Sequence, residues 1–159
     1  MGKFTRLFIA ISELGGGVLL MVGYAFATLI RAQLPLWYLL LAESLGVIAL
    51  IAGYRLIQNR SEGFSLSFAL QASQVIQIFL PRFFYRLLLG PYLTIVMSAD
   101  ETLIAPGFKG ELTIGWKGPH SASFGFNVVA AILCLLLTRA ILARRRGVTV
   151  PVNNPELSS

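Results

Sequence analysis

The chain has 159 residues, of which 56% are hydrophobic and only 13% are charged. A soluble domain carries about 25% charged residues, so this composition excludes an ordinary soluble globular protein. The net charge of +6 arises from basic residues that cluster at the ends of apolar segments, as topology signals and lipid-headgroup anchors do. We therefore expect an integral membrane protein, and no nucleic-acid binding.

Four apolar segments are long enough to cross a bilayer as helices, which takes about 20 residues. They cover residues 7–30, 34–58, 64–89 and 122–143. We predict an all-α membrane domain over residues 1–146 with four transmembrane helices. Basic residues are more numerous on the side that holds both termini, so the positive-inside rule predicts an N-in, C-in protein of a bacterial inner membrane.

The first two segments carry the same pattern, 30 residues apart. Each runs from a glutamate (Glu13 or Glu43) through small residues and a leucine to a tyrosine (Tyr24 or Tyr54). Small residues let helix backbones approach closely in lipid. If the hairpin turns at residues 33–34, residue i lies opposite residue 67 − i. This register predicts two reciprocal hydrogen bonds, Glu13 with Tyr54 and Glu43 with Tyr24.

Two other interpretations of the glutamates stay open, namely simple packing and a functional carboxylate. A charged side chain within a membrane costs roughly 2.5–3.5 kcal/mol on insertion scales and marks ion or proton pathways. Arginines at the segment ends are further candidate partners, and an ion pair would keep either acid charged.

The third segment carries polar residues at helical spacings of three, four and their multiples. This polar stripe consists of Ser67, Gln71, Gln74, Arg82 and Tyr85. Lipid cannot satisfy such groups, so the stripe should face other helices or water. Pro81 should kink the helix, and a partly interfacial helix is the alternative to a full span.

Residues 91–121 form the sizeable segment outside the spans. Residues 92–98 and 111–116 are rich in β-branched and aromatic residues, and Gly-Pro turn signals surround them. These features predict a small β-rich outer loop between the third and fourth helices. Residues 147–159 carry two prolines and no helical periodicity, so we expect an extended or disordered cytoplasmic tail.

The sequence contains no recognisable catalytic, metal or nucleotide motif. Its single histidine, His120, has no neighbouring ligands, and its single cysteine, Cys134, lies within an apolar segment. The adjacent acids Asp100 and Glu101 lie in a turn-rich loop, where acids are usually solvated. We predict no catalytic residues and no metal site, and the cofactor, if there is one, stays unknown.

These observations favour a small non-enzymatic accessory or structural subunit of a larger membrane complex. Its partners would be membrane lipids and either other membrane subunits or further copies of itself. The alternative is a small oligomeric transporter or channel that uses Glu13, Glu43 or both as a proton or cation site. A lipid- or quinone-modifying enzyme is least favoured, because it needs a base and an electrophilic or metal partner.

Overall fold

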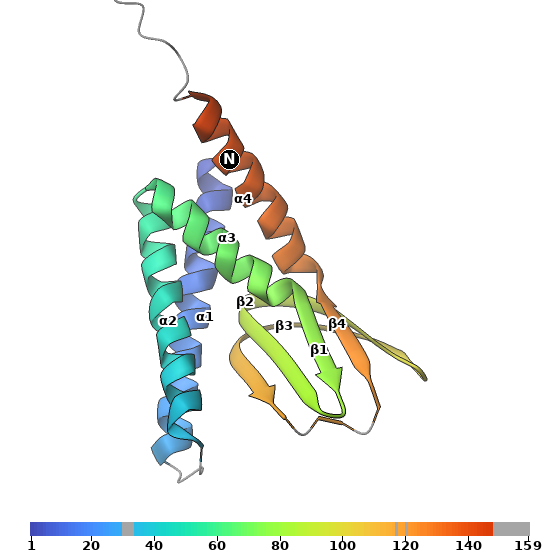
Figure 1. Cartoon of the computed structure of the whole chain (residues 1–159). Coiled ribbons are helices and arrows are strands. Elements are labelled where there is room, and N and C mark those ends of the chain that lie inside the picture. The colour runs from blue at the N-terminus through green and yellow to red at the C-terminus, as the bar shows by residue number, and fades with distance from the viewer. Residues whose placement is uncertain (30–33, 117, 120, 148–159) are drawn as a thin grey trace, which may run out of the picture.

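The computed structural model describes residues 1–29, 34–116, 118–119 and 121–147 (Figure 1). The elements in chain order are α1 (Lys3–Leu29), α2 (Leu36–Ile57), α3 (Ser61–Val75), β1 (Ile76–Leu80), β2 (Phe83–Ser98), β3 (Thr102–Gly115), β4 (Ser123–Asn127) and α4 (Val128–Gly147). The helices α1 and α2 form a long antiparallel hairpin, α3 crosses it, and α4 lies beside α3. The four strands form a sheet that packs against α1 below the crossing of α3 (Figure 1).

The prediction of an all-α protein with four transmembrane helices is wrong. Among the described helices, only α1 and α2 are long and apolar enough to cross a membrane. The predicted third span, residues 64–89, divides into α3, β1 and the start of β2. The predicted fourth span, residues 122–143, contains the strand β4 before α4 begins. The predicted tail lies outside the described residues, apart from Gly147.

The physical reason lies in the residues after Val75. Hydropathy does not show whether an apolar run forms a helix or a strand. In this run, the β-branched and aromatic residues favour a strand. Pro81 then forms the turn between β1 and β2, where its missing N–H costs nothing, instead of kinking a helix. The strand-like residues 92–98 do lie in β2, and most of residues 111–116 lie in β3. The sheet therefore extends well beyond the predicted loop.

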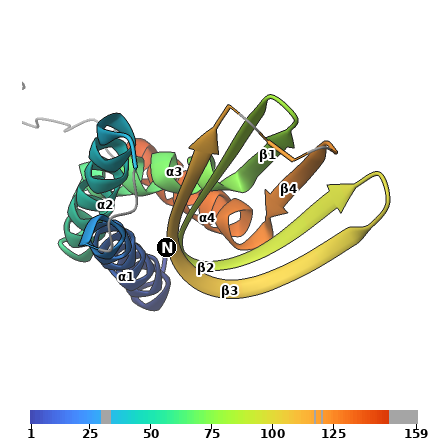
Figure 2. The same cartoon turned by 90° about the horizontal axis from the view of Figure 1, so that it is seen from below.

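The sheet is antiparallel, with strand order β1-β4-β2-β3. Strand β2 pairs with β3 from Phe84 opposite Gly115 to Met97 opposite Thr102. On its other side β2 pairs with β1 near its start and with β4 near its end, and β1 also pairs with β4. The sheet thus curls round on itself, with β2 and β3 as a long curved ribbon (Figure 2). Residues 86–93 of β2 have no described strand on that second side.

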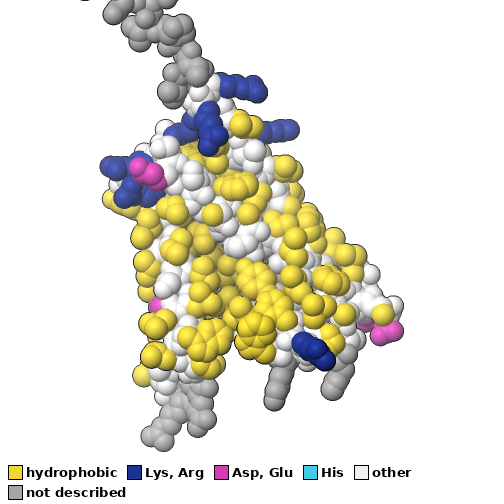
Figure 3. All heavy atoms as spheres, in the orientation of Figure 1, with side chains coloured by type: hydrophobic (Ala, Val, Ile, Leu, Met, Phe, Trp, Pro, Cys, Tyr) yellow, Lys and Arg dark blue, Asp and Glu magenta, His cyan; other side chains and the backbone are white. Residues whose placement is uncertain are grey.

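Two apolar clusters hold the helices and the sheet together, and α1 belongs to both. One joins α1, α2, α3 and the sheet around Leu20, Leu87 and Leu112. The other joins all four helices around Ile9, Leu56 and Leu137. The outer surface is also largely apolar, while basic side chains gather where α1 begins and α4 ends (Figure 3).

Candidate functional site

The Glu13 side chain on α1 is fully buried and bound by α3. Its carboxylate accepts hydrogen bonds from Ser67 Oγ at 2.7 Å and from Gln71 Nε2 at 3.4 Å. All three residues are at most 2% exposed. Ser67 and Gln71 lie one helical turn apart, so both reach the same carboxylate from one face of α3. This group, which we call the Glu13 cluster, is the most buried polar site of α1.

Close backbone packing places the Glu13 cluster. Gly16 is one turn after Glu13, and a Cβ added there would lie 2.8 Å from the Cα of Leu89 in β2. A Cβ on Gly90, which has a φ of +94°, would lie 2.8 Å from the Ser12 carbonyl oxygen. A Cβ on Gly110 in β3 would equally meet the backbone of α1. We call these three glycines the glycine junction, because they let α1 lie directly on the sheet backbone.

The structure pairs the two repeated motifs differently from the predicted register. Gly17 lies against Gly46, and Ala10 lies against Gly53, so residue i of α1 lies opposite residue 63 − i of α2. The small residues therefore do bring the two backbones together, as predicted. The register differs by four residues, about one helical turn, from the one that would join glutamate to tyrosine.

The predicted Tyr–Glu partners consequently lie apart. Tyr54 is 58% exposed, whereas Glu13 turns to α3. The Tyr24 hydroxyl lies 3.0 Å from that of Tyr38 and donates to the carbonyl oxygen of Leu112 on β3. Glu43 is partly exposed, and it has no hydrogen bond or ion pair with any described residue. Tyr24 thus links the hairpin to the sheet instead of binding Glu43.

The helical part of the predicted polar stripe does face the interior. Ser67, Gln71 and Gln74 are all buried. The remaining two members are not on a helix, since Arg82 lies in the β1–β2 turn and Tyr85 lies in β2. The Tyr85 hydroxyl nevertheless returns to α3 and donates to the Ser73 carbonyl at 2.8 Å. Burial raises the pKa of this phenol, which therefore stays protonated.

Amide side chains satisfy β2 where it has no neighbouring strand. Gln74 Oε1 accepts from the Leu89 N–H at 2.7 Å, and Asn127 Oδ1 accepts from the Leu93 N–H at 3.4 Å. Leu89 and Leu93 both lie in the stretch of β2 that pairs with neither β1 nor β4. An unpaired buried N–H costs about 1–3 kcal/mol, so these amides replace the missing ladder.

A charged cluster joins β2 to β3 on the sheet. Arg86 pairs with Glu111, while Lys109 Nζ and Thr113 Oγ1 approach the same carboxylate at 3.3 and 3.0 Å. Burial alone would raise the pKa of Glu111. The hydrogen bond and charge of Arg86, with smaller contributions from Thr113 and Lys109, outweigh burial and hold that pKa below its ordinary value. The ionised carboxylate acts as a cross-strand clamp.

The other candidates from the sequence are His120, Cys134 and the acids Asp100 and Glu101. No group of three or more potential metal ligands occurs among the described residues, and His120 lies outside them. Burial raises the pKa of the Cys134 thiol, which lowers the share of reactive thiolate at neutral pH. Asp100 and Glu101 are exposed at the tip of the β2–β3 hairpin.

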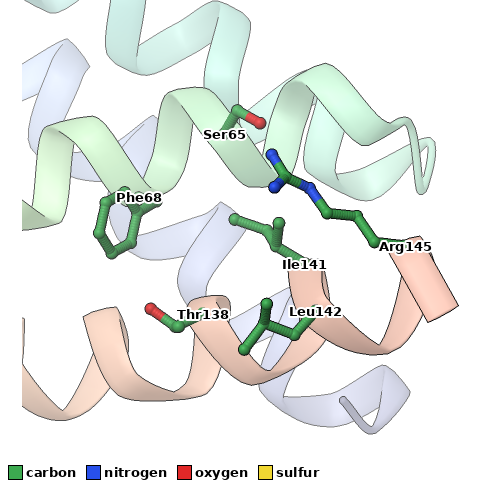
Figure 4. Close-up of a pocket in the computed structure, with 6 residues that line it drawn as sticks. All are labelled: Ser65, Phe68, Thr138, Ile141, Leu142 and Arg145. Atoms are coloured by element: carbon green, nitrogen blue, oxygen red, sulfur yellow. The ribbon is translucent and has the colours of Figure 1, made fainter.

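A shallow groove of about 290 Å³ separates α3 from α4 on the surface (Figure 4). It is lined by Ser65, Phe68, Thr138, Ile141, Leu142 and Arg145. The Arg145 guanidinium reaches back toward Ser65 at one end of the groove. These lining groups supply apolar surface, two hydroxyls and a cation, and none of them is a general base at neutral pH.

The sequence interpretation found Glu13 and the polar residues of α3, but it missed that they bind one another. The signal was present, because both groups are polar residues in apolar surroundings.

Comparisons with protein-family models, with curated proteins and with solved structures gave no match to this chain.

Proposed function

We propose that this protein is a non-enzymatic accessory subunit, anchored in a membrane by α1 and α2, that binds a partner protein through its β2–β3 hairpin. The observation that carries the proposal is the uncovered first half of β3 in that hairpin. Residues 102–109 of β3 are all exposed, and they include Leu103 at 53%, Ile104 at 65% and Phe108 at 50% exposure.

The surface of the helical hairpin supports the membrane anchor. Apolar side chains that face outward recur along α1 from Phe4 to Leu29 and along α2 from Leu36 to Ile57. A water-soluble helical hairpin would carry polar residues on such faces. The basic residues lie mainly at the end where α1 begins and α4 ends, which supports an orientation with that end in the cytoplasm.

The buried polar groups support a structural rather than a catalytic role. Glu13 is bound by two neutral side chains of α3, and Gln74 and Asn127 are bound to the backbone of β2. Each of these groups serves to hold α1, α3 and the sheet together. This arrangement lowers the support for Glu13 as the proton or cation site of the transporter alternative, because Glu13 would have to exchange a proton or cation with water. It does not bear on Glu43, which is partly exposed.

The outer edge of β3 supports strand pairing with a partner. In the strand order β1-β4-β2-β3, β3 is the end strand, and no other described strand lies beyond it. An open edge with apolar side chains is a template for an added strand. The partner we propose is therefore a membrane-complex subunit that offers an extended apolar segment.

Co-purification in mild detergent tests the proposal. The tagged full chain should retain a stoichiometric partner, and Ile104→Lys should release it because the charge enters the apolar contact. Ser61→Lys is the matched control, since it adds the same charge to an exposed polar position at the start of α3, away from the β2–β3 hairpin. Recovery of the chain alone, or equal partner loss in both variants, would contradict the proposal.

A further inference from the structure

A small pocket lies at the basic end of the molecule, between the start of α1, the α2–α3 turn and the end of α4. It has a volume of about 240 Å³ and is lined by Met1, Arg6, Asn59, Phe64, Ala140, Ala143 and Arg144. Two guanidinium groups therefore share one pocket, and none of the described residues that line it is acidic. The nearest acid in sequence, Glu62, pairs with Arg55 at 2.6 Å instead.

Arg144 is held in place by two neighbours. Its Nη2 donates to the Asn59 carbonyl at 3.1 Å and also bonds the Asn59 side chain. Its guanidinium carbon lies 4.1 Å from the centroid of the Phe64 ring. An arginine carries five N–H donors in a rigid fork, so donors remain after these contacts. The contacts fix the fork at the pocket before any ligand binds.

Arg6 contributes an unsatisfied donor. Its Nε is buried and has no hydrogen-bond partner among the described residues. A buried N–H on a charged group is costly to leave unpaired. The two like charges also repel each other, and the lining provides no carboxylate to offset this. A bound anion would supply the compensating charge.

We infer that this pocket binds a phosphate group through Arg6 and Arg144. An arginine fork matches the geometry of phosphate oxygens, which accept bidentate hydrogen bonds. If α1 is embedded as proposed above, the pocket lies at the headgroup level, because it forms where α1 begins. An anionic phospholipid is then the expected carrier of the phosphate. A free phosphate has the same chemistry and is the second source.

Native mass spectrometry of the full chain in neutral detergent tests this inference. Phosphatidylglycerol should be retained more strongly than zwitterionic phosphatidylcholine. Arg6→Gln should weaken phosphatidylglycerol binding at least about tenfold, because a charge-assisted hydrogen bond is lost. Arg60→Gln, which removes an exposed charge outside the pocket, should weaken binding no more than about fivefold, the value expected for general surface attraction. Equal losses in the two variants would overturn the inference.

Arg6→Lys is a second variant that distinguishes a loss of binding from a folding defect, since it keeps the charge but removes the Nε donor. It should bind more weakly than the unchanged chain and more strongly than Arg6→Gln. Titration with inorganic phosphate separates the two sources. Phosphate binding that depends on Arg6, without a preference for phosphatidylglycerol, would identify free phosphate as the ligand. Binding of neither ligand would refute the site, whatever the result of the partner co-purification.

Discussion

Replacing Gly16 by alanine tests whether α1 packs on the sheet through its backbone. The new Cβ would lie 2.5 Å from the carbonyl carbon of Leu89 and 2.8 Å from its Cα, whereas ordinary Cβ contacts begin at 3.4 Å. The atoms that the new Cβ would meet belong to the main chain of β2, so rotation of a side chain cannot relieve the clash. The helix and the strand would have to separate by an amount on the order of 1 Å, since the core is close-packed.

The expected cost follows from two opposing effects. Forced overpacking of this kind costs about 1–3 kcal/mol. Alanine also favours the helix over glycine by about 1 kcal/mol, which offsets part of that cost. Gly23 on the same helix has no heavy atom within 4 Å of an added Cβ, so Gly23→Ala carries the second effect alone. The difference between the two variants therefore isolates the clash.

Unfolding of both variants in mixed detergent micelles, followed by circular dichroism, measures that difference. Gly16→Ala should be less stable than Gly23→Ala by about 1–3 kcal/mol. Equal stability of the two variants would refute the direct packing of α1 on the sheet. If both variants were equally less stable than the unchanged chain, the shared loss would come from a general need for glycine in α1 and not from the glycine junction.

Three further predictions concern buried polar groups and the sheet. Glu13→Ala should lower the free energy of unfolding by about 2–4 kcal/mol, because the Ser67 hydroxyl and a neighbouring amide lose their acceptor. Glu13→Gln keeps an acceptor and should cost less than half as much in the same titration; equal costs would argue against the hydrogen bonds. Gln74→Leu should cost about 1–3 kcal/mol and speed amide exchange at Leu89, as measured by NMR, and unchanged exchange would argue against the bond. The pKa of Glu111 is lower in the folded chain than its ordinary 4.5, so the unfolded chain binds this proton more readily. Its stabilising contribution is therefore complete above about pH 4.5 and is lost as the pH falls through the folded-state pKa; Glu111→Gln should flatten this acid-dependent loss in unfolding midpoints measured against pH.

Several features of the site were predictable from sequence, and the reasons are local. A carboxylate in an apolar helix needs a partner, so Glu13 was identified before its partner was known. The helical spacing of Ser67, Gln71 and Gln74 placed them on one face, and the structure turns that face inward. The small residues of the first two segments indicated close helix packing, which Gly17 confirms.

The pairing of these groups was not predictable. Ser67 lies 54 residues from Glu13, and their contact depends on how α3 crosses the hairpin. The predicted Tyr54 partner failed because two antiparallel helices can slide by one turn while keeping similar small residues in contact. The close contacts of α1 with Gly90 and Gly110 of the sheet also constrain the position of α1. A rule that pairs residues within the α1–α2 hairpin does not include these contacts.

By itself, the sequence determined the long apolar helices α1 and α2, the inward face of α3 and the charged end, since periodicity, hydropathy and charge act over neighbouring residues. Tertiary structure decided that the apolar residues after Val75, whose β-branched and aromatic side chains also favour a strand, form strands rather than a helix. A strand needs partners far along the chain, and β1 finds them in β2 and β4. The same long-range packing gave Glu13 its partners on α3. Only in the folded chain do these polar groups, which are distant in the sequence, meet in an interior that water does not reach.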